Sequence, residues 1–139
     1  MATDKTGEKV WDFDSYVWID RYDDAVQADQ DMYARYDDVL DAVANIACTS
    51  PGAQVLDIGA GTGNLSIRCA DRGASVTGLD PSRRMLAQAE AKVAARPETE
   101  AHGVQFALAD DPFLHLPFDD GSFDAVVSTY AFHHVAHEL

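Results

Sequence analysis

From residue 54 onward, apolar residues fall into short runs that are bounded by turn residues. The first run is Gln54–Ile58 (QVLDI), and similar runs occupy residues 75–79, 104–109 and 123–128. Runs of this length, rich in Val, Leu, Ile and Phe, are typical of buried β-strands. The sequence therefore predicts four strands, of which the second ends at Asp80.

Segments with helical spacing lie between these runs. One covers residues 64–72 and is closed by Gly73, and another opens at Pro81-Ser82 and ends near Arg96. A further helix is expected from Tyr130 onward. Strands that alternate with helices predict an α/β fold, with a parallel sheet, helices on both faces and right-handed crossovers.

The chain before residue 54 has a different, helical pattern. Residues 1–9 are expected to form a flexible lead, and residues 10–28 form one short aromatic-rich helix or two. Residues 31–47 are expected to form an amphipathic helix, which Ser50-Pro51-Gly52 ends. Its apolar positions are Met32, Tyr36, Val39, Leu40, Val43 and Ala47.

A glycine-rich turn follows the first predicted strand and reads Asp-x-Gly-x-Gly-x-Gly from Asp57. A dinucleotide site needs GxGxxG, but the third glycine would fall at Asn64 or Ser66, and no Gly-Lys-Ser/Thr follows for a phosphate loop. The same spacing argues against a nicotinamide-dependent dehydrogenase. A carboxylate beside the turn repels a phosphate, whereas it binds an ammonium group with about 1–3 kcal/mol. The turn therefore favours a ligand that carries a cation.

Further acids stand at the ends of the next two predicted strands. Asp80 ends the second strand, where a carboxylate can accept both hydroxyls of a ribose; the alternative is an acid that favours the helix start after it. Asp110 ends the third strand and could accept a hydrogen bond from an adenine amino group. Asp111 is next to it, so the choice between the two stays open, as does a role as solvated loop acids.

The composition restricts the partners. The chain has 139 residues, which suits one domain, and its 24 acids against 10 bases give a net charge of −14. Such a charge disfavours nucleic acid and anionic lipid, and it fits either a solvated acidic surface or adaptation to high salt. There is no apolar run of about 18 residues and no signal-peptide core, so a cytoplasmic protein is expected. Cys48 and Cys69 are expected to be buried free thiols, without a metal site.

Three segments together resemble the class I S-adenosylmethionine-dependent methyltransferases: VLDIGAGTGNLS, GLDPSRRML and FALADDPFLHLPFDDGSFDAVVSTYAFHH. The resemblance covers about residues 52–135. The upstream segments FDSYVWIDRYDDAV and YARYDDVLDAVA are similar to small-molecule methyltransferases whose N-terminal helices cap the cofactor, especially the YrrT-like branch. The resemblance implies a Rossmann-like fold, with a helical cap at residues 1–50 and a cofactor-binding core at residues 51–139.

The resemblance also implies roles for individual residues toward S-adenosyl-L-methionine. Asp57 would pair with the methionine ammonium group, and Asp80 would hold the ribose hydroxyls. Asp110, or Asp111 beside it, would bind the adenine amino group. The remaining cofactor-binding residues would be Gly59, Ala60, Gly61 and Gly63 under the methionyl and ribose parts, Pro81 and Met85 near adenine, Ser128 with Thr129 on the methyl side, and Tyr22 over the methionyl end. For Tyr22, a packing role is an equal alternative.

The expected reaction transfers a methyl group to a small-molecule acceptor and leaves S-adenosyl-L-homocysteine. His133 and His134 are the nearest candidates for a general base, although a structural or substrate-lining role is favoured. The family's sheet has seven strands, and this sequence supplies the first four. The alternative function is therefore a cofactor-binding module without catalysis of its own, whose exposed sheet edge could pair with another copy.

Overall fold

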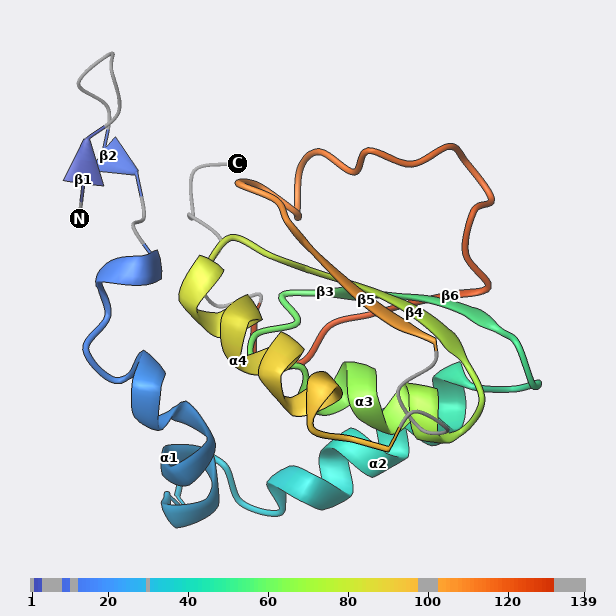
Figure 1. Ribbon diagram of the computed structural model, residues 1–139, viewed down its shortest axis with the longest axis horizontal. Coiled ribbons are helices and arrows are strands. Elements are labelled where there is room, and N and C mark those ends of the chain that lie inside the picture. Colours follow the sequence, from blue (N-terminus) through green and yellow to red (C-terminus); the bar gives the residue numbers. More distant parts are fainter. Residues whose placement is uncertain (1, 4–8, 11–12, 30, 98–102, 132–139) are drawn as a thin grey trace.

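A four-stranded parallel sheet forms the centre of the protein in the computed structural model, which describes residues 2–3, 9–10, 13–29, 31–97 and 103–131 (Figure 1). The strand order is β5-β4-β3-β6. The strands are β3 (Gln54–Ile58), β4 (Ser75–Asp80), β5 (Val104–Leu108) and β6 (Ala125–Val127). The predicted parallel sheet is thus confirmed, and β6 lies at one edge of it.

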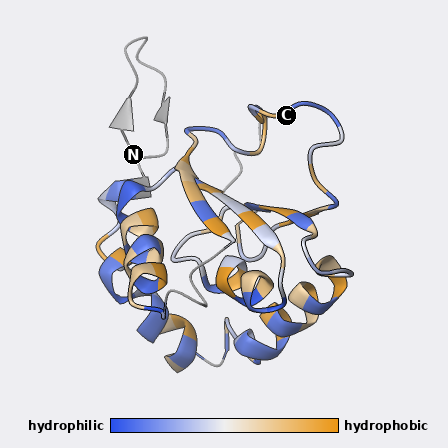
Figure 2. Ribbon diagram, turned by 45° about the vertical axis from the view of Figure 1, so that its right-hand side comes forward, coloured by the Kyte–Doolittle hydropathy of each residue, from blue (hydrophilic) through white to orange (hydrophobic). Residues whose placement is uncertain are grey.

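Three helices cover one face of this sheet, as Figure 1 shows. They are α2 (Tyr36–Ala47), α3 (Asn64–Asp71) and α4 (Arg83–Ala94). Val55 and Val76 of the sheet pack with Leu40 of α2 and with Leu65 and Cys69 of α3 in one buried cluster. In Figure 2 the helices carry hydrophobic and hydrophilic residues on different sides, as this one-sided packing requires.

The expectation of helices on both faces is wrong for the described residues. On the opposite face, Leu56, Ile58 and Leu79 pack against Phe113, Phe118 and Phe123 of a loop. The strand order explains the difference. Right-handed crossovers from β3 to β4 and from β4 to β5 run in one direction and place α3 and α4 on the same face. The step from β5 to β6 reverses direction and crosses the other face, and no helix forms within it.

The N-terminal segment forms more structure than the sequence indicated. Two short strands, β1 (Ala2–Thr3) and β2 (Lys9–Val10), pair antiparallel, although a flexible lead was expected there. The two 3₁₀ turns η1 (Phe13–Ser15) and η2 (Ile19–Arg21) then lead into α1 (Tyr22–Ala28). Ile19 and Val26 are each 1% exposed, so these two side chains anchor the segment to the rest of the protein.

Two helices begin later than predicted. The helix expected from residue 31 starts at Tyr36, because the Asp29 side chain accepts the backbone N–H groups of Asp31 and Met32 and forms a turn instead. Arg35 then has a positive φ of 57°, and Met32 is left 69% exposed. The helix expected to open at Pro81-Ser82 begins at Arg83. Ser82 is its N-cap, since the Ser82 hydroxyl accepts the N–H of Met85. Pro81 precedes the cap and does not open the helix.

Candidate functional site

A cleft lies at the carboxyl ends of β3 and β4, between the sheet and the N-terminal segment. The space between its walls, together with the open solvent at its mouth, measures about 760 Å³. The N-terminal segment lines the cleft with Tyr16, Trp18, Ile19 and Tyr22, called the aromatic wall below. The glycine turn and the start of α4 also line it.

The glycine turn bends the chain closely around the end of β4. Gly59 and Ala60 both donate their N–H groups to the carbonyl of Leu79. Gly59, Gly61 and Gly63 have positive φ values of 74°, 56° and 81°, which side chains other than hydrogen rarely allow. Beside Gly61 there is no heavy atom within 4 Å of where a Cβ would stand, so the backbone there faces the open cleft. A ligand can therefore approach this backbone directly.

Asp57 lies at the bottom of the cleft and is 1% exposed. Its Oδ2 accepts a hydrogen bond of 2.6 Å from the Ser66 hydroxyl on α3. Burial raises the pKa of Asp57 from 3.8 to about 6; the Ser66 hydrogen bond opposes this rise, and the nearby charge of Asp80 adds to it. At neutral pH the protein thus holds a carboxylate that lacks a cationic partner among the described residues. A bound cation would relieve this cost.

Asp57→Asn is expected to stabilise the ligand-free protein by about 1–2 kcal/mol near pH 8, because the wild type must bury a charge there. Since the folded-state pKa of about 6 is above the ordinary 3.8, the contribution of Asp57 to stability is fully present below about pH 4. It is lost as the pH rises through about 6. Urea unfolding at both ends of this range should show the variant's advantage near pH 8 only. An advantage of the same size near pH 4 would contradict this explanation.

Asp80 is the second acid of the cleft and is 8% exposed. Its Oδ2 accepts the N–H of Gly61 and its Oδ1 accepts the N–H of Ser82, both at 2.8 Å. Burial raises the pKa of Asp80, while these two hydrogen bonds lower it in part and the charge of Asp14 raises it further. Each oxygen keeps a second lone pair, so the carboxylate can hold the turn and still accept hydroxyl donors from a ligand.

Aromatic side chains from distant parts of the chain meet along the cleft. Tyr22 of α1 and Tyr36 of α2 line it together with Tyr130, whose backbone has a positive φ of 54°. The rings of Tyr36 and Tyr130 lie 5.3 Å apart. Burial raises the pKa of both Tyr22 and Tyr36, so these phenols stay neutral. These tyrosines therefore offer flat apolar surface, and the neutral phenols of Tyr22 and Tyr36 are not general bases.

The structure brings most of the predicted site residues together at the cleft. Those that line it are Tyr22, Asp57, Gly59, Ala60, Gly61, Asp80, Pro81, Met85 and Thr129. Gly63 is buried beneath the turn, and the Ser128 hydroxyl donates to the carbonyl of Ile58. Asp110 and Asp111 are exposed and do not line the cleft; Asp111 accepts the N–H of Leu114 in a turn. His133 and His134 lie outside the described residues.

Several lining residues were not singled out from the sequence. They are Tyr16, Trp18, Ile19, Tyr36, Thr62, Asn64, Leu65, Ser82, Phe113, Tyr130 and Ala131. For Tyr16, Trp18 and Ile19, the only indication in the sequence was that residues 13–22 are rich in aromatic side chains. Thr62 stands between Gly61 and Gly63, and Asn64 follows Gly63. Their place in the glycine turn was therefore a sign that they could line the cleft.

Comparison with known proteins identifies the class to which this fold and cleft belong. Residues 55–139, more than half of the chain, match the family described as methyltransferase domain. The chain belongs to this family, which confirms the resemblance found in the sequence motifs. None of the helices in the described part of the chain is long and apolar enough to cross a membrane.

Individual relatives agree with this assignment. An uncharacterized methyltransferase of Geobacillus sp. (strain WCH70) is 36% identical over 87% of this chain and 53% of its own length. The uncharacterized methyltransferase YrrT of Bacillus subtilis (strain 168) is 35% identical over the same shares. The chain thus spans about half the length of these relatives. Among solved structures, magnesium protoporphyrin IX methyltransferase from Synechocystis PCC 6803, with bound S-adenosylmethionine, is similar with a TM-score of 0.67 and 28% identity, covering 89% of this chain and 61% of that one.

Proposed function

We propose that this protein binds S-adenosyl-L-methionine and transfers its methyl group to a small-molecule acceptor. One observation carries the proposal: the charged side chains that line the cleft among the described residues are two buried aspartates, Asp57 and Asp80. They stand at the ends of adjacent strands, with the glycine turn between them. A cleft of this charge disfavours phosphate and favours a cationic ligand.

The residues present fit the chemistry of this cofactor. Asp57 is placed to stabilise an ammonium group at the bottom of the cleft, and Asp80 has free lone pairs for ribose hydroxyls. The backbone at Gly61 leaves room for the ligand beside the turn. Pro81 and Met85 offer apolar contact to a purine ring. The proposal also includes a hydrogen bond from the adenine amino group to Asp110 or Asp111. It further places Ser128 and Thr129 on the methyl side of the cofactor.

The chemistry that this chain must supply is mainly binding and orientation. When bound, the cofactor supplies a methyl group that its positive sulfur already activates. The described residues hold the ligand, exclude water with the aromatic wall, and keep nucleophile and methyl group in line. The neutral phenols of Tyr22 and Tyr36 do not remove a proton from the acceptor. Acceptors that need no base, or a base outside the described residues such as His133 or His134, are therefore favoured.

Cofactor binding is tested most directly by calorimetric titration of the chain with S-adenosylmethionine, S-adenosylhomocysteine and NAD⁺. Micromolar affinity is expected for the first two and none for NAD⁺, because the buried aspartates repel its pyrophosphate. Absence of S-adenosylmethionine binding at millimolar concentration, about 4 kcal/mol of affinity, would overturn the proposal.

Methyl transfer is then tested with cofactor labelled on the methyl group and a panel of amine, phenol, thiol and carboxylate acceptors. Transfer to at least one small molecule is expected. Binding without transfer to any acceptor would favour the alternative, a cofactor-binding module without catalysis of its own. The cytoplasmic location, expected from the sequence, and the absence of a nucleic-acid partner, expected from its acidic charge, belong to the same proposal.

A further inference from the structure

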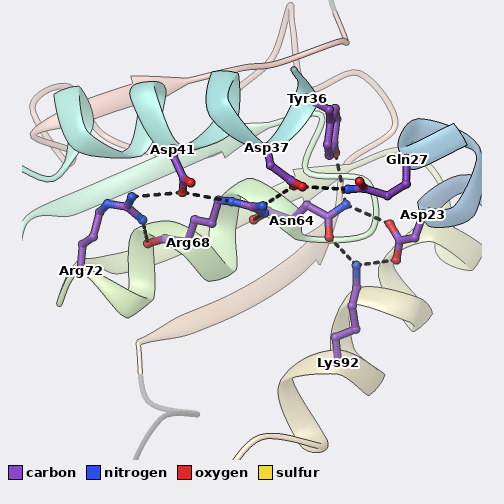
Figure 3. A network of polar contacts seen from close by, with 9 residues as sticks. All are labelled: Asp23, Gln27, Tyr36, Asp37, Asp41, Asn64, Arg68, Arg72 and Lys92. Carbon is purple, nitrogen blue, oxygen red and sulfur yellow. Dashed lines mark hydrogen bonds and ion pairs between the residues drawn. The ribbon is translucent and has the colours of Figure 1, made fainter. Parts of the chain in front are cut away.

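One carboxylate connects the N-terminal segment to the glycine turn. Asp23 on α1 accepts hydrogen bonds from the Thr62 hydroxyl at 2.7 Å and from the Asn64 amide at 2.9 Å. It also forms an ion pair of 2.8 Å with the ammonium group of Lys92 on α4. Figure 3 shows Asp23 between Asn64 and Lys92. Three separate elements thus converge on a single side chain of α1.

The donors belong to the part of the core that shapes the ligand site. Thr62 stands between Gly61 and Gly63 and is 1% exposed. Asn64 is the first residue of α3, and its amide oxygen accepts a further hydrogen bond of 2.7 Å from Lys92. Asp23, Asn64 and Lys92 therefore form a closed ring of hydrogen bonds. This ring fixes the end of the turn relative to both α3 and α4.

The ionisation of Asp23 agrees with this arrangement. Burial alone would raise its pKa, but the hydrogen bonds from Lys92, Thr62 and Asn64 together lower the pKa below its ordinary value. The carboxylate is thus charged at neutral pH, as a partner of Lys92 must be. Asp23 itself does not line the cleft, whereas its chain neighbour Tyr22 does.

A second set of polar contacts in the same region provides a contrast. Asp37 and Asp41 of α2 form ion pairs with Arg68 and Arg72 of α3. These residues fasten two helices along their length, and Figure 3 shows them extending away from Asp23. The Asp37 side chain is 53% exposed, similar to the 41% of Asp23. It accepts hydrogen bonds from Gln27 of α1 and Arg68 of α3, and none of its hydrogen bonds or ion pairs among the described residues reaches the glycine turn.

We propose that Asp23 is a positioning residue for cofactor binding, which holds the glycine turn in its binding shape and closes the N-terminal segment against it. The inference rests on the proposed function, because the ligand in question is S-adenosylmethionine. It assigns the affinity of the cleft partly to a side chain that does not touch the ligand. The aromatic wall and the glycine turn, which contains Thr62, then take up their binding positions together.

The test compares Asp23→Asn with Asp37→Asn, which removes the same charge from the same polar region. We expect Asp23→Asn to weaken S-adenosylmethionine binding about tenfold or more in calorimetry, and Asp37→Asn to change it less than about twofold. Thr62→Val and Lys92→Met each remove one partner of Asp23 and should each reproduce part of the loss. They keep the test decisive if Asp23→Asn does not fold.

A spectroscopic measurement separates positioning from a general loss of stability. In a Trp11→Phe background, Trp18 is the single tryptophan, and ligand should change its fluorescence in the parent and in Asp37→Asn. In Asp23→Asn this change should be reduced even at saturating ligand. Equal affinities of Asp23→Asn and Asp37→Asn would overturn the inference and leave the proposed function intact. A parent protein that does not bind the ligand would overturn both.

Discussion

Asp80→Asn is expected to lower the affinity for S-adenosylmethionine about 30-fold or more, which corresponds to about 2 kcal/mol. Both oxygens of Asp80 accept backbone N–H groups, one from Gly61 and one from Ser82. An asparagine can accept only one of them, because its nitrogen would face the other donor. The substitution therefore disturbs the glycine turn or the start of α4, and it also removes the charge proposed to hold the ribose. Hydrogen bonds to a charged group contribute about 1.5–3 kcal/mol each.

The measurement is calorimetric titration of the variant beside Asp120→Asn, which removes a charge from an exposed loop residue. The control should bind as tightly as the wild type. An affinity for Asp80→Asn within about threefold of the control would mean that Asp80 neither shapes the turn nor contacts the ligand. Circular dichroism of both variants shows whether the comparison is made between folded proteins.

Gly63→Ala is expected to lower the free energy of unfolding by about 2–5 kcal/mol. With φ at 81°, any residue with a Cβ is strained there by about 1–2 kcal/mol. A Cβ would also stand 2.8 Å from the ring of Phe106 and 3.0 Å from the Cβ of Ala89. Because β5 and α4 both pack against this point, neither contact can relax easily, and overpacking costs a further 1–3 kcal/mol or so.

Gly52→Ala is the matched control for this prediction. Gly52 has a φ of 79°, nearly the same strain, but no heavy atom lies within 4 Å of the position of a Cβ. The control should therefore lose only about 1–2 kcal/mol. Urea unfolding of the two variants and the wild type isolates the packing contribution. If both variants lose the same stability, the close packing of Phe106 and Ala89 around the turn is not rigid.

The sheet could be predicted from the sequence because its signals are local. The predicted strand at residues 54–58 coincides with β3, and β4 ends one residue after the predicted run 75–79. Both runs are apolar and bounded by turn residues, so each can be found from its own residues. The start of α2 could not be predicted from the periodicity of its apolar residues, because the Asp29 side chain competes for backbone N–H groups just before it. The prediction of helices on both faces of the sheet was wrong because an apolar loop covers the second face. The hydrophobic pattern alone does not distinguish such a loop from a helix.

In the candidate site, too, some residues could be predicted from the sequence and others could not. Asp57, Asp80 and the glycines were found because strand ends and tight turns place them together in any fold of this topology. The aromatic wall and Asp23 were missed as a unit because their contacts join residues far apart in the chain. Lys92 reaches Asp23 across 69 positions, and Asn64 reaches it across 41. No spacing rule connects such pairs before the path of the chain is known.

The same separation has a consequence for how the protein folds. The N-terminal segment is synthesised before its partners on α4, which follow about 70 residues later: Ser82 for Asp14, Gln88 for Ile19 and Lys92 for Asp23. Strands β3, β4 and β5 pair with their neighbours along the chain, at lower entropic cost, whereas β6 pairs with β3 from far along the chain. The N-terminal segment is therefore expected to dock after strands β3, β4 and β5 have paired. During that interval the aromatic residues destined for the wall of the cleft remain exposed to solvent.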